Sequence, residues 1–515
     1  MNRSLQDKIR ALEATGAARE LSAIRRGIEK ESLRVGPDGV IASTPHPAAL
    51  GSALSHDWIT TDYSEALLEF ITPVYRNIEE MLEFLTDLHV FTYANIGEEI
   101  LWTNSMPCIL HGDESIPIAD YGTSNIGRMK HVYRRGLAVR YGRLMQTIAG
   151  IHYNFSLSDD FFAAWLGVDS KEARSEQYFN LVRNFHRHCW LVLYLFGSAP
   201  AVCRTFVAGR EHTLTPFGKN SFYLPHGTTL RMSRLGYQNS AQADIHVSTN
   251  SLDEYVRTLR AATEQNYPPY ERLGVVVDGE YQQLNSNLLQ IENEFYTVIR
   301  PKRTIRPLEK PTTALKERGV EYVEVRSIDL NPFEPIGINA ALIRFMDAFL
   351  LYCMLDDSPP IGPEEEREIT CNRDLTVTQG RAADTRIYLR GRMRPLREEA
   401  HRVLDGIEAV AAMLDTFDGT GHGDVVRADR EKIDHPELTP SARIIAEMSE
   451  NDESYYEYAM RIATMHETYF EERVLAPERL AALRARAEES LETTRTLESG
   501  ETEPFDRFLA RYFAG

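Results

Sequence analysis

Acidic side chains occupy alternate positions in two short stretches of this 515-residue chain. The stretches are residues 27–35 and 321–326. Both have the composition of β-strands, in which alternate side chains share a face, so Glu29 and Glu31 point the same way. Glu324 and Arg326 share a face of the second stretch in the same manner. Burying charge on a sheet costs free energy, so such a face is best explained if it holds cations and an anionic ligand.

Two further segments add carboxylates and a histidine to this pattern. Residues 58–73 contain Asp62 and Glu69, and their end, residues 67–72, is short, apolar and followed by proline, as in a strand. Residues 146–156 alternate as another strand, with His152, Asn154 and Ser156 on one face. Hard cations such as Mg²⁺ or Mn²⁺ prefer carboxylate oxygens, tolerate a histidine and commonly bridge phosphates. The candidate metal ligands are Glu29, Glu31, Asp62, Glu69, His152 and Glu324.

Every member of this set also has a purely structural interpretation. A single glutamate on a half-exposed sheet is usually solvated, and a single histidine such as His152 is more often a hydrogen-bonded core residue. Arg326 could hold a transferring phosphoryl group or form a salt bridge with a sheet neighbour, and Arg231 has the same two interpretations. Taken jointly, with Val323 and Val325 free to pack on a core behind Glu324, the residues favour a metal site.

Composition limits the partners. The formal net charge of -19 argues against a nucleic-acid backbone or an anionic membrane as the main partner. It does not exclude a nucleotide, because a few arginines and a divalent ion can reverse the field of a pocket. The chain has neither an apolar signal-peptide core at its start nor an apolar run of 18 residues, and its five cysteines have no paired spacing. We therefore expect a cytoplasmic protein with reduced thiols.

The elements that must position these residues indicate an α+β fold. Helices are expected near the amino terminus, over 75–100, 128–141 and 171–196, and through most of the chain from about residue 335. Asp278-Gly279 predicts a hairpin turn, residues 289–300 look strand-like, and residues 355–385 are expected to form a variable or mobile loop region. Hairpins without regular βαβ alternation favour an antiparallel sheet. No phosphate-binding loop of the G-x-x-x-x-G-K-[ST] type occurs, so a nucleotide would have to bind in another way.

Several longer segments resemble the proteobacterial form of glutamate–cysteine ligase, the enzyme of the first step of glutathione biosynthesis. The resemblance is weakest over residues 355–395 and in the carboxyl-terminal helices. The segments are RRGIEKESLRV (25–35), HPAALGSALSHDWITTDYSEALLEFITPV (46–74), YGTSNIGR (121–128), RYGRLMQTIAGIHYNFS (140–156), LQIENEFYTVIRPKR (289–303) and GVEYVEVRSIDLNPFEPIG (319–337).

The resemblance implies a fold similar to glutamine synthetase, with an antiparallel sheet that forms a funnel-shaped active site. It implies one domain over residues 1–515, with a catalytic sheet region at about 20–335 and a mainly helical part at 336–515. The implied reaction activates the γ-carboxylate of L-glutamate with ATP and then joins it to L-cysteine. The implied partners are ATP, L-glutamate and L-cysteine, with Mg²⁺ or Mn²⁺ as cofactor. The family is also consistent with feedback inhibition by glutathione, and we expect a monomer.

The resemblance also assigns roles to individual residues. It makes the six candidate ligands metal-binding and places Arg231 and Arg326 at phosphate and substrate. The tyrosines, which singly are more often packing residues, match an aromatic pocket for cysteine, and one glutamine matches a contact to glutamate. These substrate residues are Tyr63, Tyr133, Tyr237, Tyr296 and Gln146.

Two alternatives stay open at this point. A related carboxylate–amine ligase would use the same activation with a different amine, and a binding protein could keep the sheet without catalysis. The complete acidic set argues against an idle protein, because a binder has no need for several metal sites.

Overall fold

A seven-stranded sheet lies at the centre of the computed structural model, which describes residues 3–107, 109–168, 170–236 and 245–514. Its strand order is β11-β12-β5-β1-β3-β2, with β4 paired to β1, and these strand pairs are all antiparallel. The predicted α+β class is therefore confirmed. The strands are β1 (Arg25–Val35), β2 (Ile59–Thr61), β3 (Leu67–Ile71), β4 (Ile100–Leu101), β5 (Ile151–Ser156), β11 (Ile299–Lys302) and β12 (Tyr322–Ile328).

Register brings the polar positions of neighbouring strands together. Glu31 of β1 lies opposite Glu69 of β3, and Glu29 lies opposite His152 of β5. Glu324 of β12 lies opposite Asn154 of β5. Because residues opposite one another in a ladder share a face, one face of the sheet carries this whole polar set. We call it the acidic face.

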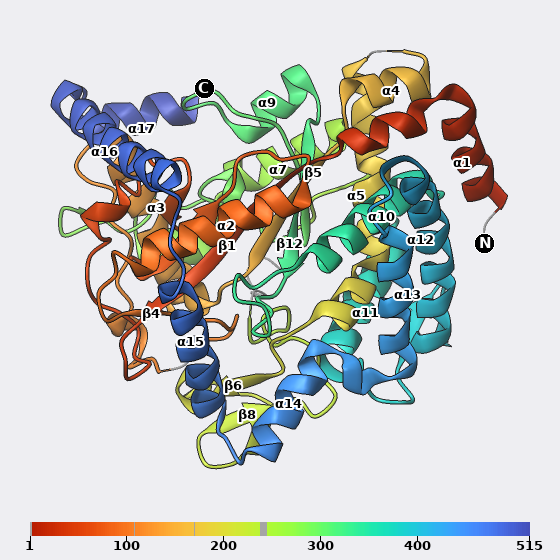
Figure 1. Cartoon of the computed structure of the whole chain (residues 1–515). Coiled ribbons are helices and arrows are strands. Elements are labelled where there is room, and N and C mark those ends of the chain that lie inside the picture. The colour runs from red at the N-terminus through yellow and green to blue at the C-terminus, as the bar shows by residue number, and fades with distance from the viewer. Residues whose placement is uncertain (1–2, 108, 169, 237–244, 515) are drawn as a thin grey trace.

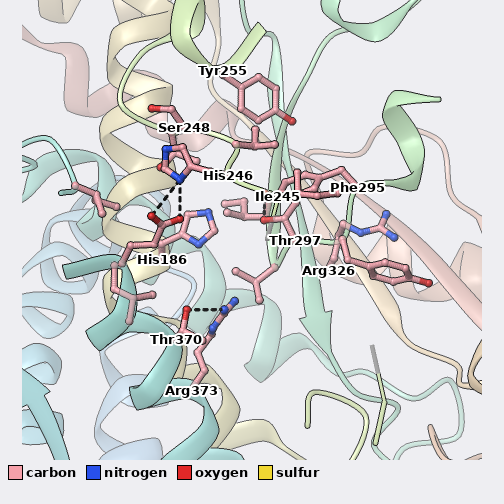
Figure 2. Close-up of a pocket in the computed structure, with 18 of the residues that line it drawn as sticks. His186, Ile245, His246, Ser248, Tyr255, Phe295, Thr297, Arg326, Thr370 and Arg373 are labelled. Carbon is pink, nitrogen blue, oxygen red and sulfur yellow. Dashed lines mark hydrogen bonds and ion pairs between the residues drawn. The ribbon is translucent and has the colours of Figure 1, made fainter. Parts of the chain in front are cut away.

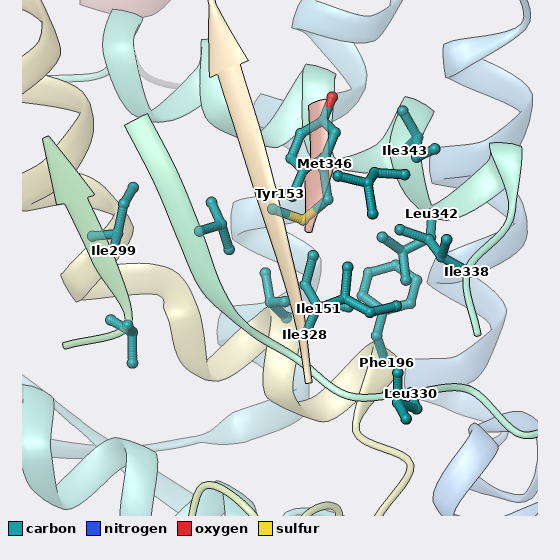
Figure 3. Close-up of a cluster of buried hydrophobic side chains, with 14 of the residues drawn as sticks. Ile151, Tyr153, Phe196, Ile299, Ile328, Leu330, Ile338, Leu342, Ile343 and Met346 are labelled. Carbon is teal, nitrogen blue, oxygen red and sulfur yellow. The ribbon is translucent and has the colours of Figure 1, made fainter. Parts of the chain in front are cut away.

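The other face of the sheet packs on helices α2 (Ile78–Tyr93), α5 (Lys171–Phe196) and α10 (Ala340–Leu355). The alternation along β5 explains this, because the fully buried Ile151 and Tyr153 occupy the positions between its polar residues. Figure 3 shows them among Ile328, Ile343 and Met346, which β12 and α10 supply. We call this the core face.

The remaining helices surround the sheet. Figure 1 shows α10, α12 and α13 gathered on one side of the molecule, and α3, α16 and α17 on the opposite side. They are α1 (Arg3–Thr15), α3 (Asn125–Tyr141), α4 (Asp159–Leu166), α6 (Arg204–Val207), α7 (Leu252–Glu264), α8 (Pro268–Leu273), α9 (Pro311–Arg318), α11 (Pro363–Gln379), α12 (Leu396–Asp418), α13 (His422–Asp434), α14 (Pro440–Glu450), α15 (Tyr455–Glu471), α16 (Pro477–Gly500) and α17 (Phe505–Ala514).

Three small sheets complete the fold. Two are two-stranded hairpins, and Asp278 and Gly279 form the predicted turn of the first with φ values of 51° and 85°. The strands are β6 (Ala201–Cys203), β7 (Thr215–Phe217) and β8 (Ser221–Tyr223) in one sheet, β9 (Val276–Val277) and β10 (Glu280–Tyr281) in the next, and β13 (Arg386–Leu389) and β14 (Arg392–Pro395) in the last.

Two predicted segments are wrong. Residues 355–385 contain the 17-residue helix α11, which begins at Pro363 after Gly362 and carries three glutamates in its first turn. Proline is preorganised for a first helical turn, and acidic groups there interact well with the helix dipole. Residues 289–300 become strand only from Ile299, because Glu292 and Glu294 bind distant groups instead of lining a sheet.

The cysteine prediction also needs correction. Cys203 is disulfide-bonded, so the expectation that every thiol is reduced is wrong. Cys189, Cys353 and Cys371 are free. Within the described ranges, no helix has the length and apolarity that crossing a membrane would require.

Candidate functional site

Three adjacent strands place Glu29, His152 and Glu324 together on the acidic face. The Nδ1 atom of His152 lies 3.1 Å from Glu29 Oε2 and 3.7 Å from Glu324 Oε1. One nitrogen or oxygen from each of the three residues lies within 4.8 Å of the others. Hard cations accept such a set of two carboxylates and an imidazole. Three of the six predicted ligands are thus in reach of one ion.

The other three predicted ligands lie beside this cluster. Glu31 Oε1 is 4.0 Å from His152 Nε2. Burial, followed by the charges of Glu29, Asp62 and Glu31, raises the pKa of Glu69 well above its ordinary value. Burial and Asp62 raise the pKa of Glu31 to about 8, although Arg231 and Arg326 oppose this shift. Carboxylates that raise one another's pKa lie close together with too few cations, a situation that a divalent ion relieves.

Basic residues surround the Glu324 end of the cluster. Lys302 Nζ and Arg326 Nη1 each lie 3.4 Å from Glu324 Oε1, and Arg300 Nη1 lies 4.0 Å from Oε2. Burial opposes ionisation of Glu324, but Lys302, Arg326 and His152 hold its pKa well below the ordinary value. The sequence reasoning assigned no role to Arg300 and Lys302. They are two residues apart on β11, and this spacing could have predicted that both side chains lie on the same face of the sheet. In the structure they lie opposite Glu324 and Tyr322.

Asn154 is another residue whose role the sequence reasoning missed. It shares the predicted polar face of β5, and its Nδ2 donates a hydrogen bond of 2.9 Å to Glu29 Oε1. This bond fixes one oxygen of Glu29, while the other faces His152.

Arg231 is deeply buried behind the cluster, with 1 % of its surface exposed. Its Nη2 donates a hydrogen bond of 2.8 Å to the carbonyl of Arg326, and its Nη1 lies 3.6 Å from Asp329 Oδ1. Its guanidinium lies against Gly150, where any Cβ would overlap it. Gly150 in turn donates its N–H to Glu31 Oε2 at 2.6 Å. This packing holds Arg231, Glu31 and Arg326 in fixed relative positions.

The predicted substrate residues divide into groups. The hydroxyl of Tyr296 lies 3.5 Å from Gln146 Oε1. Tyr296 is also close to Tyr133 on α3, because burial, Glu294 and then Tyr296 raise the pKa of Tyr133 well above its ordinary value. Gln146 is buried, and its Nε2 has no hydrogen-bond partner among the described residues. Tyr63 is buried next to other charges, those of Arg143 and Asp113. Tyr237 lies outside the described residues.

A cavity of about 330 Å³ opens beside the cluster. Arg326 lines one end of it, and His186, Thr370 and Arg373 of α5 and α11 line the other (Figure 2). His152 also lines the cavity. Between them the wall is largely apolar and includes Ile245, Val247, Phe295, Val298 and Ile299. The cavity therefore suits a ligand with a flat or apolar part and a charged end directed at the cluster.

Comparisons with known proteins agree on one family. The family model described as glutamate-cysteine ligase matches residues 9–376. Proteins named glutamate–cysteine ligase from Alcanivorax borkumensis and Hahella chejuensis are 48% and 49% identical to this chain, over 99% and 96% of both lengths respectively. The crystal structure of glutamate–cysteine ligase from Francisella tularensis in complex with AMP has a TM-score of 0.90 and 35% identity, and the match covers 95% of this chain and 97% of that chain.

Proposed function

Since the chain belongs to the glutamate–cysteine ligase family, it makes γ-glutamylcysteine at the expense of ATP, and we propose that the acidic face of its sheet is where this happens. The observation that carries the assignment is the cluster of Glu29, His152 and Glu324, whose ligand atoms lie within 4.8 Å of one another, with Glu31 and Glu69 of raised pKa beside it. Carboxylates gathered in this way with too few cations are a poor structural element but a good site for divalent cations.

The reaction first joins two anions, the γ-carboxylate of glutamate and the γ-phosphoryl group of ATP, and then releases inorganic phosphate. An oxygen of the γ-carboxylate of glutamate attacks the γ-phosphorus of ATP, the bond to the β-phosphate oxygen breaks, and ADP leaves. The amine of cysteine then attacks the γ-carbonyl carbon of the acyl phosphate, loses a proton and expels inorganic phosphate. Each attack requires negative charge to be neutralised in advance.

The acidic residues fit the ion that such a reaction needs. Glu29, His152 and Glu324 would hold one Mg²⁺ or Mn²⁺, and Glu31, Asp62 and Glu69 extend the donor set for another. A bound divalent ion there would neutralise the phosphate oxygens and orient them.

Arginine acts on the group that is transferred. Arg326 lies on the acidic face and lines the cavity, with 20% of its side chain exposed, so a γ-phosphoryl group bound there would be within its reach. Arg231 lines the same cavity from behind and supports Arg326 through its carbonyl. Planar guanidinium groups suit phosphate because they donate two parallel hydrogen bonds.

The cavity and the aromatic residues receive the substrates. ATP occupies the cavity with its base against the apolar wall and its phosphates directed at Arg326, and the AMP complex of the Francisella tularensis relative supports nucleotide binding in this fold. Gln146, with its free Nε2, contacts glutamate, and Tyr296 and Tyr133 contribute to a pocket for cysteine. Tyr63 and Tyr237 stay predicted substrate residues, and Tyr237 lies outside the described residues.

A coupled assay of ADP release tests the proposal. The purified chain with ATP, Mg²⁺ and glutamate should release ADP at a rate that cysteine raises far more than alanine, serine or glycine, and mass spectrometry should show γ-glutamylcysteine. In a parallel thermal-unfolding measurement, Mg²⁺ should raise the melting temperature of the EDTA-treated protein and fail to do so for Glu324→Gln. Equal stabilisation of both proteins would place the metal elsewhere.

A further inference from the structure

Glu324 has more cationic neighbours than a metal ligand needs. Lys302, Arg326 and Arg300 all lie within 4.0 Å of its carboxylate, in addition to His152. A carboxylate can bind a divalent ion only if its oxygens are not fully occupied by other positive groups. The surplus of cations therefore points to a second anion at this position, one that comes from outside the protein.

Two of these cations, Arg300 and Lys302, differ in how firmly they are held. Arg300 is nearly buried, and its Nη2 donates hydrogen bonds to the carbonyls of Asn293 and Phe295. It is therefore fixed by the backbone. Lys302 has no such attachment in the described ranges, where its only ion-pair partner is Glu324 and 26% of its side chain is exposed. Of the two, Lys302 is the one that can move.

We infer that Lys302 is a phosphate-binding residue, which leaves Glu324 and contacts the terminal phosphates of ATP when the nucleotide binds. This inference rests on the proposed function, because it places the phosphates at the acidic face. Lys302 ends β11, and Arg326 lies on the adjacent strand β12 with its guanidinium at the same Glu324 oxygen. An anion at Arg326 therefore lies within reach of the Lys302 side chain, whose four-carbon stem allows its ammonium group to turn through several ångströms.

The movement resolves a charge conflict. Without nucleotide, the ammonium of Lys302 contributes to holding the pKa of Glu324 low and acts on Glu29 as well. With nucleotide, transfer of the ammonium to the phosphates would remove one of the two cations at Glu324 Oε1, while Oε2 has no hydrogen-bond partner among the described residues. Lys302 thus has a partner in both states, and its side chain is never left unpaired on the acidic face.

A merely structural role makes a different prediction. If Lys302 only compensated Glu324, its loss would change the stability of the metal-free protein and would affect all nucleotides alike. If it binds phosphate, its loss affects triphosphate binding selectively, because AMP lacks the terminal phosphates.

Calorimetric titration separates the two roles. The probes are AMP and a non-hydrolysable β,γ-imido analogue of ATP, each with Mg²⁺, and the variants are Lys302→Gln and Lys302→Arg. We expect Lys302→Gln to weaken binding of the triphosphate analogue by about 10- to 100-fold, the value of one or two charged hydrogen bonds, with AMP affinity nearly unchanged. Lys302→Arg should recover much of the loss because it keeps the charge.

Arg303→Gln is the matched control. It removes a positive charge from the next residue, whose side chain pairs with Glu321 and donates to the carbonyl of Arg318, away from Glu324. Equal losses of AMP and triphosphate affinity in Lys302→Gln, or the same selective loss in Arg303→Gln, would overturn the inference. If the unmodified protein releases no cysteine-stimulated ADP, the proposed function fails first, and this outcome is distinguishable because it does not involve Lys302.

Discussion

The two faces of the central sheet both bury charged groups, but the ion pair of Arg26 on the core face is complete, whereas Glu31 and Glu69 on the acidic face keep raised pKa values. On the core face, Arg26 Nη2 lies 2.7 Å from Asp347 Oδ2, and Tyr153 donates a hydrogen bond of 2.6 Å to Asp347 Oδ1. On the acidic face, burial and Asp62 raise the pKa of Glu31 in spite of Arg231 and Arg326, and burial, Glu29, Asp62 and Glu31 raise that of Glu69. A buried ion pair that is completed within the protein supports the fold, whereas an incomplete set of buried charges favours bound ligands.

The largest effect should follow from Glu29→Gln on the acidic face. The amide keeps the size of the side chain but removes a charge that faces His152, so we expect a loss of kcat of more than about 100-fold with an unchanged melting temperature. Steady-state ADP release and thermal unfolding would be measured on the same preparation. Glu321→Gln, which changes an acidic residue paired with Arg303, serves as a control that should stay active. Near-normal turnover in Glu29→Gln would remove this residue from the site.

Asp347→Asn on the core face should lower the stability of the fold and leave kcat nearly unchanged, the reverse of the effect of Glu29→Gln. Arg26, 5 % exposed, would then be a buried charge without its counter-ion, which costs about 3 kcal/mol or more of stability. Chemical denaturation would show the loss, while kcat per folded molecule should change little. The exposed Asp357→Asn is the control, with a change below about 0.5 kcal/mol. If Asp347→Asn lowered kcat and left stability intact, the two faces would not differ as described.

The smallest effect should be a gain in folding stability, caused by Glu69→Gln on the acidic face. Glu69→Gln removes one of the mutually repelling carboxylates, so in EDTA the variant should be more stable than the natural protein by about 1 kcal/mol. A carboxyl group whose pKa is higher in the folded state than in the unfolded state loses stabilising effect as pH rises above the unfolded value. The gain should therefore be larger near pH 8 than near pH 5, and unfolding curves at both pH values check this. A variant that is less stable at pH 8 would show that Glu69 is already neutralised within the protein.

Local alternation was enough to predict which residues share the acidic face. Glu29 and Glu31 on β1 and His152 on β5 follow the two-residue period of a strand, and the structure places all three on one surface. The same period put Val323 and Val325 on the core face, where both are fully buried. This part of the prediction needed no knowledge of which strands pair.

The failures of prediction involve contacts between distant segments. Glu292 accepts hydrogen bonds from the N–H and hydroxyl of Thr312, and Arg140 and Tyr141 of α3 bind Glu294. These partners hold residues 292–294 in a short helical turn, although their composition is typical of a strand. The pairing of β1 with β3 could not be predicted from local sequence either. The two strands are joined by a long connection that includes β2, and this connection sets the register that brings Glu69 opposite Glu31.

Gly150 limits how far this sequence can vary. Its N–H holds Glu31, and the space where a side chain would stand is filled by Arg231, which is itself held by Asp329 and the carbonyl of Arg326. A methyl group at this position would overlap the guanidinium and force it to shift, which would disturb its contacts with Asp329 and the carbonyl of Arg326. A residue without a functional group of its own therefore couples an acid and a base of the site, and we expect exchanges at positions 31, 150 and 231 to affect one another.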